Sequence, residues 1–207
     1  LSLYLIQQDI QHGPLRLIFT IDEETGMTGA MNLDPKHVQD VKYIINCDSE
    51  DIGMLGVGSA GSVHTHFHRP IHWQQPAGKQ AFTIEAKDFV GGHSGETINR
   101  GKSNAIKALS LALRRIAQAG VAYTLASIDG GVAANAIPSQ ASAVIVTADE
   151  KAEAAIKQAV QEEQAQIAEV YGSVETKAQF IVEGADVPEK TFSAEDTKAI
   201  VNLLNKI

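Results

Sequence analysis

The chain has a single cysteine, Cys47, among its 207 residues, so it cannot form an internal disulfide framework. Basic residues are also scarce, because 17 Lys and Arg stand against 25 Asp and Glu, and the formal net charge is −8. This balance, without any basic run, argues against nucleic acid or an anionic membrane as a partner. No apolar run is long enough to span a bilayer, and no signal peptide is evident. These absences together predict a cytoplasmic protein with no membrane association.

The hydrophobic content of 44% is sufficient for a packed core, and the length suits one domain or two small ones. Four glycines fall within nine positions, at Gly53, Gly56, Gly58 and Gly61. A glycine-rich stretch of this kind is typical of a hinge between domains. We therefore predict one domain over residues 1–61 and a second over residues 62–207.

Two apolar segments of the first domain each end in carboxylates. Residues 15–21 are followed by Asp22, Glu23 and Glu24, and residues 41–48 end in Asp48. Apolar runs of this length are typical of strands buried on both faces of a parallel sheet. The residues between them suit a short helix at 27–32, which completes a strand–helix–strand unit and predicts an α/β fold for this domain.

The carboxyl ends of parallel strands meet at one edge of a sheet, where ligands bind. Glu23, Glu24 and Asp48 are therefore expected to converge there. Carboxylate oxygens are ligands of hard and borderline cations such as zinc, so a metal site is the leading interpretation. The acidic cluster by itself is equally consistent with a solvated turn.

The second domain has the pattern of an antiparallel sheet covered by helices. Phe82, Ile84 and Ala86 alternate with polar residues and predict a half-buried strand. The other predicted strands cover residues 123–128, 141–147 and 174–182. Long helices are predicted from Asn99 or Ser103 to Gly120, from 149 or 150 to about 170, and after Ser193. This domain is therefore predicted to be an α+β sandwich.

Four motifs occur in order along the chain: Ile21–Ala30 (IDEETGMTGA), Ile45–Glu50 (INCDSE), Gly91–Gly95 (GGHSG) with Asn104 and Ala105, and Asn135–Pro138 (NAIP). Through them the sequence resembles the aminoacyl-histidine dipeptidases (Xaa-His dipeptidases, bacterial carnosinases). These are dinuclear zinc peptidases, related to carboxypeptidase G-type enzymes and aminoacylases. The resemblance covers nearly the whole chain. It implies a parallel-sheet catalytic domain joined to an α+β lid and dimerisation domain.

The resemblance also implies roles for individual residues. Glu23 would be the general base, Glu24 a ligand of one metal and Asp48 a ligand of the other. His93 would be the lid histidine that reaches the active site across a dimer interface, and Asn135 a lid residue that holds the substrate near its carboxylate. The implied cofactor is a pair of zinc ions, with cobalt or manganese as alternatives. The implied partners are a small dipeptide substrate and a second copy of the chain, bound through the lid.

Some family features are absent from this sequence. Relatives have a His-x-Asp motif and a metal-bridging Asp before this region, and a final ligand His near their C-terminus. No histidine here is followed two places later by Asp. We therefore expect an internal fragment of a longer enzyme that lacks three metal ligands and is inactive alone.

The histidines have simpler readings as well. His64, His66 and His68 share one face if residues 63–68 form a strand, which suits either metal binding or a solvent-facing surface. His93 lies in a glycine-rich loop, where it is either an ordinary loop residue or a donor to the oxyanion of the reaction. Ser94 is interpreted as structural, because no motif pairs it with a base.

The predicted function is hydrolysis of carnosine-like Xaa-His dipeptides by the parent enzyme. Two zinc ions would acidify a bridging water, Glu23 would take its proton, and His93 of the partner subunit would stabilise the tetrahedral intermediate. Two alternatives remain. One is a tripeptidase or deacylase with the same dimetal site, and the other is a non-catalytic lid module that mediates dimerisation.

Overall fold

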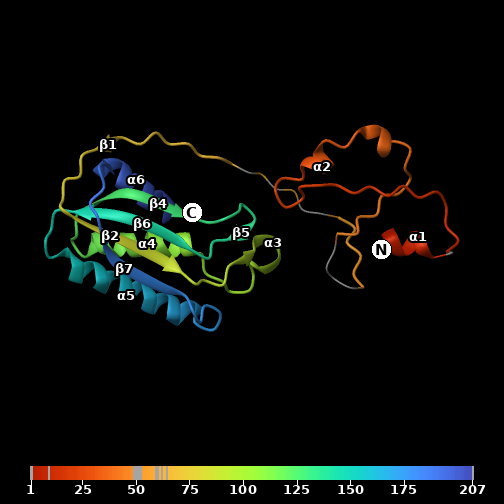
Figure 1. Ribbon diagram of the computed structural model, residues 1–207. Coiled ribbons are helices and arrows are strands. Elements are labelled where there is room, and N and C mark those ends of the chain that lie inside the picture. Colours follow the sequence, from red (N-terminus) through yellow and green to blue (C-terminus); the bar gives the residue numbers. More distant parts are fainter. Residues whose placement is uncertain are drawn as a thin grey trace. The chain divides into compact units, whose positions relative to one another are not determined.

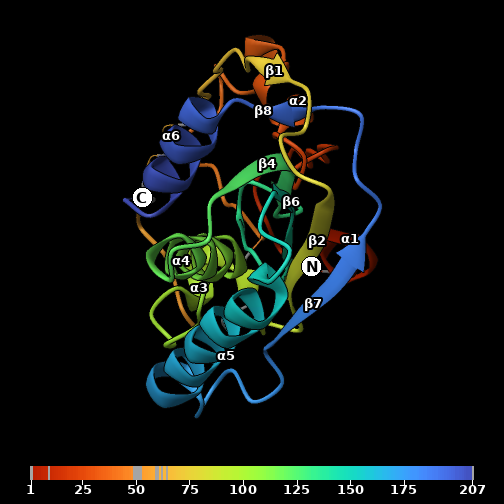
Figure 2. The same ribbon diagram turned by 90° about the vertical axis from the view of Figure 1, so that its left-hand side faces the viewer.

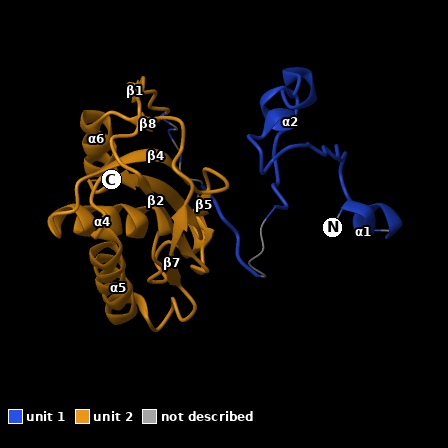
Figure 3. Cartoon of the chain, turned by 60° about the vertical axis from the view of Figure 1, so that its left-hand side comes forward, with its two compact units in different colours: residues 1–65 blue, residues 66–207 orange. Residues whose placement is uncertain are grey.

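The computed structural model describes residues 2–8, 10–48, 53–58, 61, 63 and 65–206. The chain divides into two compact units, Leu1–Thr65 and His66–Ile207, which Figure 3 shows in separate colours. Within the described ranges, no helix is both long and apolar enough to cross a membrane.

Unit 1 contains only short helical elements in its described part: α1 (Ser2–Gln7), α2 (Thr28–Met31) and the 3₁₀ helix η1 (Pro35–His37). The helix predicted at 27–32 is therefore confirmed as α2. The strands predicted at 15–21 and 41–48 are wrong, because none of their residues is in a strand. Phe19 and Ile45 accordingly remain 76% and 78% exposed. A buried strand forms only where neighbouring strands accept and donate its backbone hydrogen bonds, and the described part of unit 1 has no such neighbour.

An ion pair holds the starts of these two apolar segments together. The Arg16 guanidinium donates to both carboxylate oxygens of Asp40, with N–O distances of 2.7 and 3.1 Å, and to the carbonyl of His37 at 2.7 Å. The hydrogen bond from Arg16 lowers the pKa of the Asp40 carboxyl. Residues 16 and 40 are thus adjacent, as a parallel pair of strands requires. No ladder of backbone hydrogen bonds joins the described residues that follow them.

Unit 2 is built on a four-stranded antiparallel sheet with strand order β4-β6-β2-β7. Its strands are β2 (Gln80–Lys87), β4 (Tyr123–Gly130), β6 (Ala141–Thr147) and β7 (Gln179–Ala185). Its helices are α3 (Ser94–Thr97), α4 (Ala105–Gln118), α5 (Ala152–Tyr171) and α6 (Ala194–Leu204). Two smaller sheets pair β1 (Trp73–Gln74) with β8 (Thr191–Phe192) and β3 (Gly92–His93) with β5 (Ala136–Ile137). All of these elements except β3 and β8 are labelled in Figure 1.

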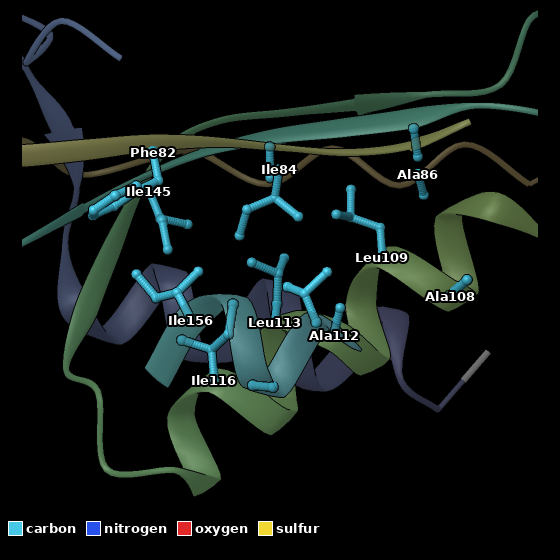
Figure 4. Packing of buried hydrophobic residues seen from close by; sticks show 14 of the residues in the cluster. Phe82, Ile84, Ala86, Ala108, Leu109, Ala112, Leu113, Ile116, Ile145 and Ile156 are labelled. Atoms are coloured by element: carbon cyan, nitrogen blue, oxygen red, sulfur yellow. The ribbon is translucent and has the colours of Figure 1, made fainter. Parts of the chain in front are cut away.

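The core of unit 2 lies between the sheet and the helices. Phe82, Ile84 and Ala86 point from β2 towards α4, as the alternating pattern predicts (Figure 4). The predicted apolar stripe of α4 is fully buried; its members are Ala105, Leu109, Ala112, Leu113 and Ile116. The long helices α4 and α5 cover one face of the sheet (Figure 2). The prediction of an antiparallel α+β lid is therefore confirmed.

Several element boundaries differ from the predictions. Helix α4 is capped by Asn104, whose side-chain oxygen accepts from the backbone N–H groups of Ile106 and Lys107. Strand β7 begins at Gln179 and not at residue 174. Near the end of α5, the Val170 side chain is 56% exposed. Glu175, which lies shortly before β7, instead directs its carboxylate to the backbone N–H groups of Val90 and Ser103.

The helix predicted after Ser193 is confirmed as α6, and its N-cap Ser193 belongs to a larger cluster around Asp196. The Ser193 hydroxyl oxygen accepts from the Asp196 N–H at 3.0 Å. The Asp196 side chain is 1% exposed and accepts from Arg69 Nη2 at 2.6 Å and from the His72 backbone N–H at 2.8 Å. These bonds, with the His72 backbone N–H as the largest cause, lower the pKa of Asp196 well below its ordinary range. The cluster therefore fixes residues 69–72 to the start of α6.

Candidate functional site

The acidic turn of unit 1 is organised by Asp22. The Asp22 carboxylate accepts from the Thr28 hydroxyl at 2.7 Å, and its carbonyl accepts from the Met27 N–H at 2.7 Å. Asp22 and Met27 both have left-handed backbone conformations, with φ values of 57° and 55°. The turn formed in this way exposes the side chains of Glu23 and Glu24. Asp22 is thus used to shape the turn, and its two neighbours face solvent.

Gly29 makes this shape possible. Its N–H donates to the Ile21 carbonyl at 3.1 Å, which brings the two backbones together. A Cβ atom at position 29 would lie 2.5 Å from the Ile21 nitrogen and 2.8 Å from its carbonyl oxygen. Every residue other than glycine would therefore force the turn apart.

Asp48, the third predicted carboxylate, is exposed, and its backbone N–H donates to the Asn46 side chain at 2.9 Å. Carboxylates are suitable donors for zinc. In the part of the chain that the structure describes, however, no three His, Cys, Asp or Glu side chains are close enough to hold a metal ion. The described residues thus offer the right donor atoms for a metal but do not form an assembled site.

The predicted histidine face is also not assembled. His64 lies outside the described residues, while His66 and His68 are exposed and residues 65–72 form no strand. The two-residue alternation of a strand, which would place these histidines on one face, therefore does not apply to His66 and His68.

The structure does bring His93 and Asn135 together. His93 in β3 pairs with Ala136 in β5, and the next N–H, that of Ser94, donates to the Asn135 carbonyl at 2.7 Å. The sequence predicts a loop for this glycine-rich segment. It contains instead this two-residue strand and the single helical turn α3. Two motifs that are far apart in sequence thus form one backbone unit.

The orientation of the His93 ring fixes its hydrogen-bonding role. Its Nδ1 accepts from the Gly95 N–H at 3.2 Å, at the N-terminus of α3. A neutral imidazole that accepts at Nδ1 carries its proton on Nε2. The exposed side of the ring therefore presents a donor, as stabilisation of an oxyanion requires.

A groove of about 550 Å³ adjoins this unit. Polar atoms come from Ser94, Lys102 and Asn104, and the remaining lining is mainly apolar, from Ile98, Ile106 and the segments 130–134 and 136–138. Its volume and mixed lining are typical of sites for small molecules. His93 and Asn135 are not in its lining, but their neighbours Ser94 and Ala136 are.

Two residues next to this unit, Lys102 and Glu175, were not predicted from the sequence. Lys102 contacts the loop through hydrogen bonds to Gly91 and Thr97. Glu175 is 4% exposed and accepts from two backbone N–H groups. Neither residue stands in a recognisable motif, and the alternating pattern places Glu175 on the polar side of a strand. Its burial is the signal that identifies it, and this signal exists only in the folded chain.

Comparison with known proteins agrees with this architecture. Residues 84–183 match the sequence model of a family described as peptidase dimerisation domain. The chain is 37% identical, over 150 residues, to the cytosol non-specific dipeptidase of Escherichia coli; this alignment covers 71% of the chain and 30% of the relative.

The structure matches the crystal structure of aminoacylhistidine dipeptidase from Vibrio alginolyticus with a TM-score of 0.69 and 25% identity. That match covers 99% of this chain and 42% of the other protein. The resemblance to dipeptidases inferred from the motifs is thus confirmed, and unit 2 has the fold of the peptidase dimerisation domain. The chain spans less than half the length of either relative.

Proposed function

We propose that the whole protein is a metal-dependent dipeptidase to which this chain contributes catalytic, metal-binding and lid residues. The observation that carries the proposal is the β3–β5 pairing, which places His93 beside Asn135 in a peptidase dimerisation domain. The acidic turn supports it, because its backbone presents Glu23 and Glu24 to solvent at the position where the motif predicts a base and a ligand. Glu24 and Asp48 would each hold one metal ion, for which zinc suits the carboxylate donors.

The proposed roles follow from the chemistry of each group. A bound zinc pair would supply Lewis acidity at the scissile carbonyl. Glu23 accepts a proton from the attacking water and returns it to the leaving amine. The Nε2–H of His93 donates to the oxyanion of the tetrahedral intermediate, and the Asn135 amide binds the carboxylate end of the substrate. In a homodimer formed through unit 2, His93 acts on the active site of the partner subunit.

The proposed substrates are Xaa-His dipeptides of the carnosine type. The motifs EETGMTGA and GGHSG favour this class, as does the solved relative described as an aminoacylhistidine dipeptidase. The curated relative is described as non-specific, so a wider range of dipeptides is the second candidate. The name of that relative also supports a cytoplasmic location. We further propose that residues 1–207 alone are inactive, because they carry the base and only two of the expected metal ligands.

Metal content and activity, measured together, test this proposal. The whole protein and the 207-residue chain would be analysed for bound metal and assayed with β-alanyl-histidine, a dialanine peptide, a tripeptide and an N-acetyl amino acid. We expect about two zinc ions per whole protein, hydrolysis of the dipeptides, and no turnover by the short chain. Hydrolysis of only the tripeptide or the acetylated compound would favour the tripeptidase or deacylase alternative. A whole protein without any hydrolytic activity would favour a dimerisation module.

A further inference from the structure

The segment that carries His93 is closed at its base by one buried carboxylate. The two oxygens of Glu175 accept from the N–H of Val90 at 2.8 Å and from the N–H of Ser103 at 2.9 Å. Val90 and Ser103 are the first and last residues of the segment 90–103, which we call the histidine loop. The Glu175 side chain is 4% exposed, so both bonds are protected from water. One side chain thus fixes both ends of this loop.

A second connection crosses the inside of the histidine loop. Lys102 Nζ donates to the Gly91 carbonyl at 2.5 Å and to the Thr97 hydroxyl oxygen at 3.1 Å. The Thr97 hydroxyl in turn donates to the His93 carbonyl at 2.9 Å. The ammonium group is thereby linked, through one hydroxyl, to the backbone of His93.

Gly92 provides the space for this ammonium group. Its φ is 121°, and a Cβ atom there would lie 2.5 Å from Lys102 Nζ and 3.0 Å from Thr97 Oγ1. A side chain at position 92 would therefore occupy the position of the lysine. The glycine and the lysine form a matched pair, in which the missing side chain of one admits the charged group of the other.

We propose that Glu175 and Lys102 are positioning residues that hold His93 where it acts on the substrate. This inference rests on the proposed function of His93, because Glu175 and Lys102 affect catalysis only if His93 takes part in it. Both oxygens of Glu175 are used by the histidine loop, and a buried carboxylate is costly unless such bonds offset its desolvation. Hydrogen bonds to a transition state depend steeply on geometry, so a small displacement of the imidazole lowers turnover more than substrate binding.

Glu175→Gln and Lys102→Met in the whole protein test the proposal. The amide of glutamine turns a donor towards one of the two backbone N–H groups, and methionine keeps the bulk of lysine without its donors. We expect kcat to fall by about 10- to 100-fold in each variant, with KM changed by less than about twofold. The matched controls are Glu183→Gln and Lys177→Met, which alter exposed residues and should keep wild-type kinetics.

A double-variant comparison separates positioning from general stability. If Glu175 acts through His93, then Glu175→Gln should cause no further loss of kcat in a His93→Ala background. If the losses of kcat from Glu175→Gln and His93→Ala multiply in the double variant, the inference is overturned. It is also overturned if Glu175→Gln or Lys102→Met alone leaves kcat unchanged.

Nuclear magnetic resonance of the whole protein with labelled histidine gives a readout independent of activity. We expect the ring resonances of His93 to shift in Glu175→Gln and Lys102→Met, and to stay unchanged in both controls. Unshifted resonances in both test variants would overturn the inference even for an active enzyme. If the His93 resonances shift in Glu175→Gln and Lys102→Met but His93→Ala keeps full turnover, the structural link between these residues and His93 holds. The proposed function of His93 is then rejected.

Discussion

The N–H of Ser94 donates to the carbonyl of Asn135 across 2.7 Å. This bond continues the β3–β5 ladder by one residue and makes the backbones of the GGHSG and NAIP motifs neighbours. A substrate group that contacts one motif therefore lies close to the other. The order of the motifs along the chain does not reveal this relationship. The proximity of their backbones supports the proposal that both motifs act on a single ligand.

Replacing His93 by alanine tests the oxyanion role. We expect kcat to fall by about 10²- to 10³-fold, because one preorganised donor to the intermediate is lost, while bound metal stays constant. Steady-state kinetics with elemental analysis would measure both quantities. His68→Ala, at an exposed histidine of the same unit, is the matched control and should behave as wild type. A His93→Ala protein with normal kcat would remove His93 from the mechanism.

Glu23→Gln and Glu24→Gln should separate the base from the ligand. Glu23→Gln keeps the shape of the side chain but cannot accept a proton, so we expect metal to be retained and kcat to fall by about 10²- to 10⁴-fold. Glu24→Gln should instead lower the metal content of the whole protein. Elemental analysis and kinetics on both variants check these outcomes. The opposite pattern would exchange the two assignments.

Gly29→Ala should distort the acidic turn. The added Cβ would lie 2.5 Å from the Ile21 nitrogen, so the backbone must move, and we expect a destabilisation of about 1–3 kcal/mol. Chemical denaturation of the whole protein would measure it. Gly13→Ala is the control, because nothing lies within 4 Å of its added Cβ. Equal stability of the two variants would contradict the tight contact between Gly29 and Ile21.

Leu113→Ala should show how much unit 2 depends on its core. Leu113 belongs to the buried stripe of α4 and is 0% exposed, so its truncation should destabilise the fold by about 2–5 kcal/mol. Leu203, which is 51% exposed in α6, provides the control, and its replacement by alanine should cost far less. Urea denaturation followed by circular dichroism would distinguish the two. Similar losses would mean that burial of Leu113 is not the source of its contribution.

Asp196 should make stability depend on pH in the acid range. Its pKa is lowered in the folded state, so its contribution is complete above the ordinary Asp pKa of about 3.9 and is lost as the pH falls below that value. We expect Asp196→Asn to be less stable than wild type at neutral pH, with a difference that shrinks below about pH 4. Thermal unfolding from about pH 3 to about pH 7 would show this convergence. Asp186→Asn, at an exposed position, should follow the wild-type curve.

The sequence predicts the core of unit 2 well because its patterns are local. The alternation around Ile84 and the stripe around Leu109 follow the periods of a strand and a helix, and both residues are 0% exposed. The apolar runs near Phe19 and Ile45 have an equally clear pattern, but a strand also needs partner strands, and sequence composition does not supply them.

The candidate site was predictable only where a motif contained its residues. His93 and Asn135 were found in this way, and their backbone pairing supports treating them together. Asn104 was missed as a helix cap because several good capping residues stand close together in that stretch. Glu175 could not be found, since its hydrogen-bonding partners are 85 and 72 residues earlier in the chain. Contacts of that range depend on the completed fold.

The carboxylate that closes the histidine loop also sets an order of events during protein synthesis. The loop leaves the ribosome well before Glu175, which follows Ser103 by 72 residues. At elongation rates of about 5–20 residues per second, the Val90 and Ser103 amides wait several seconds for their acceptor. The segment bearing His93 thus acquires this anchor only after Glu175 has been synthesised. A nascent chain that stops before residue 175 would carry this histidine on a loop that lacks both of its bonds to Glu175.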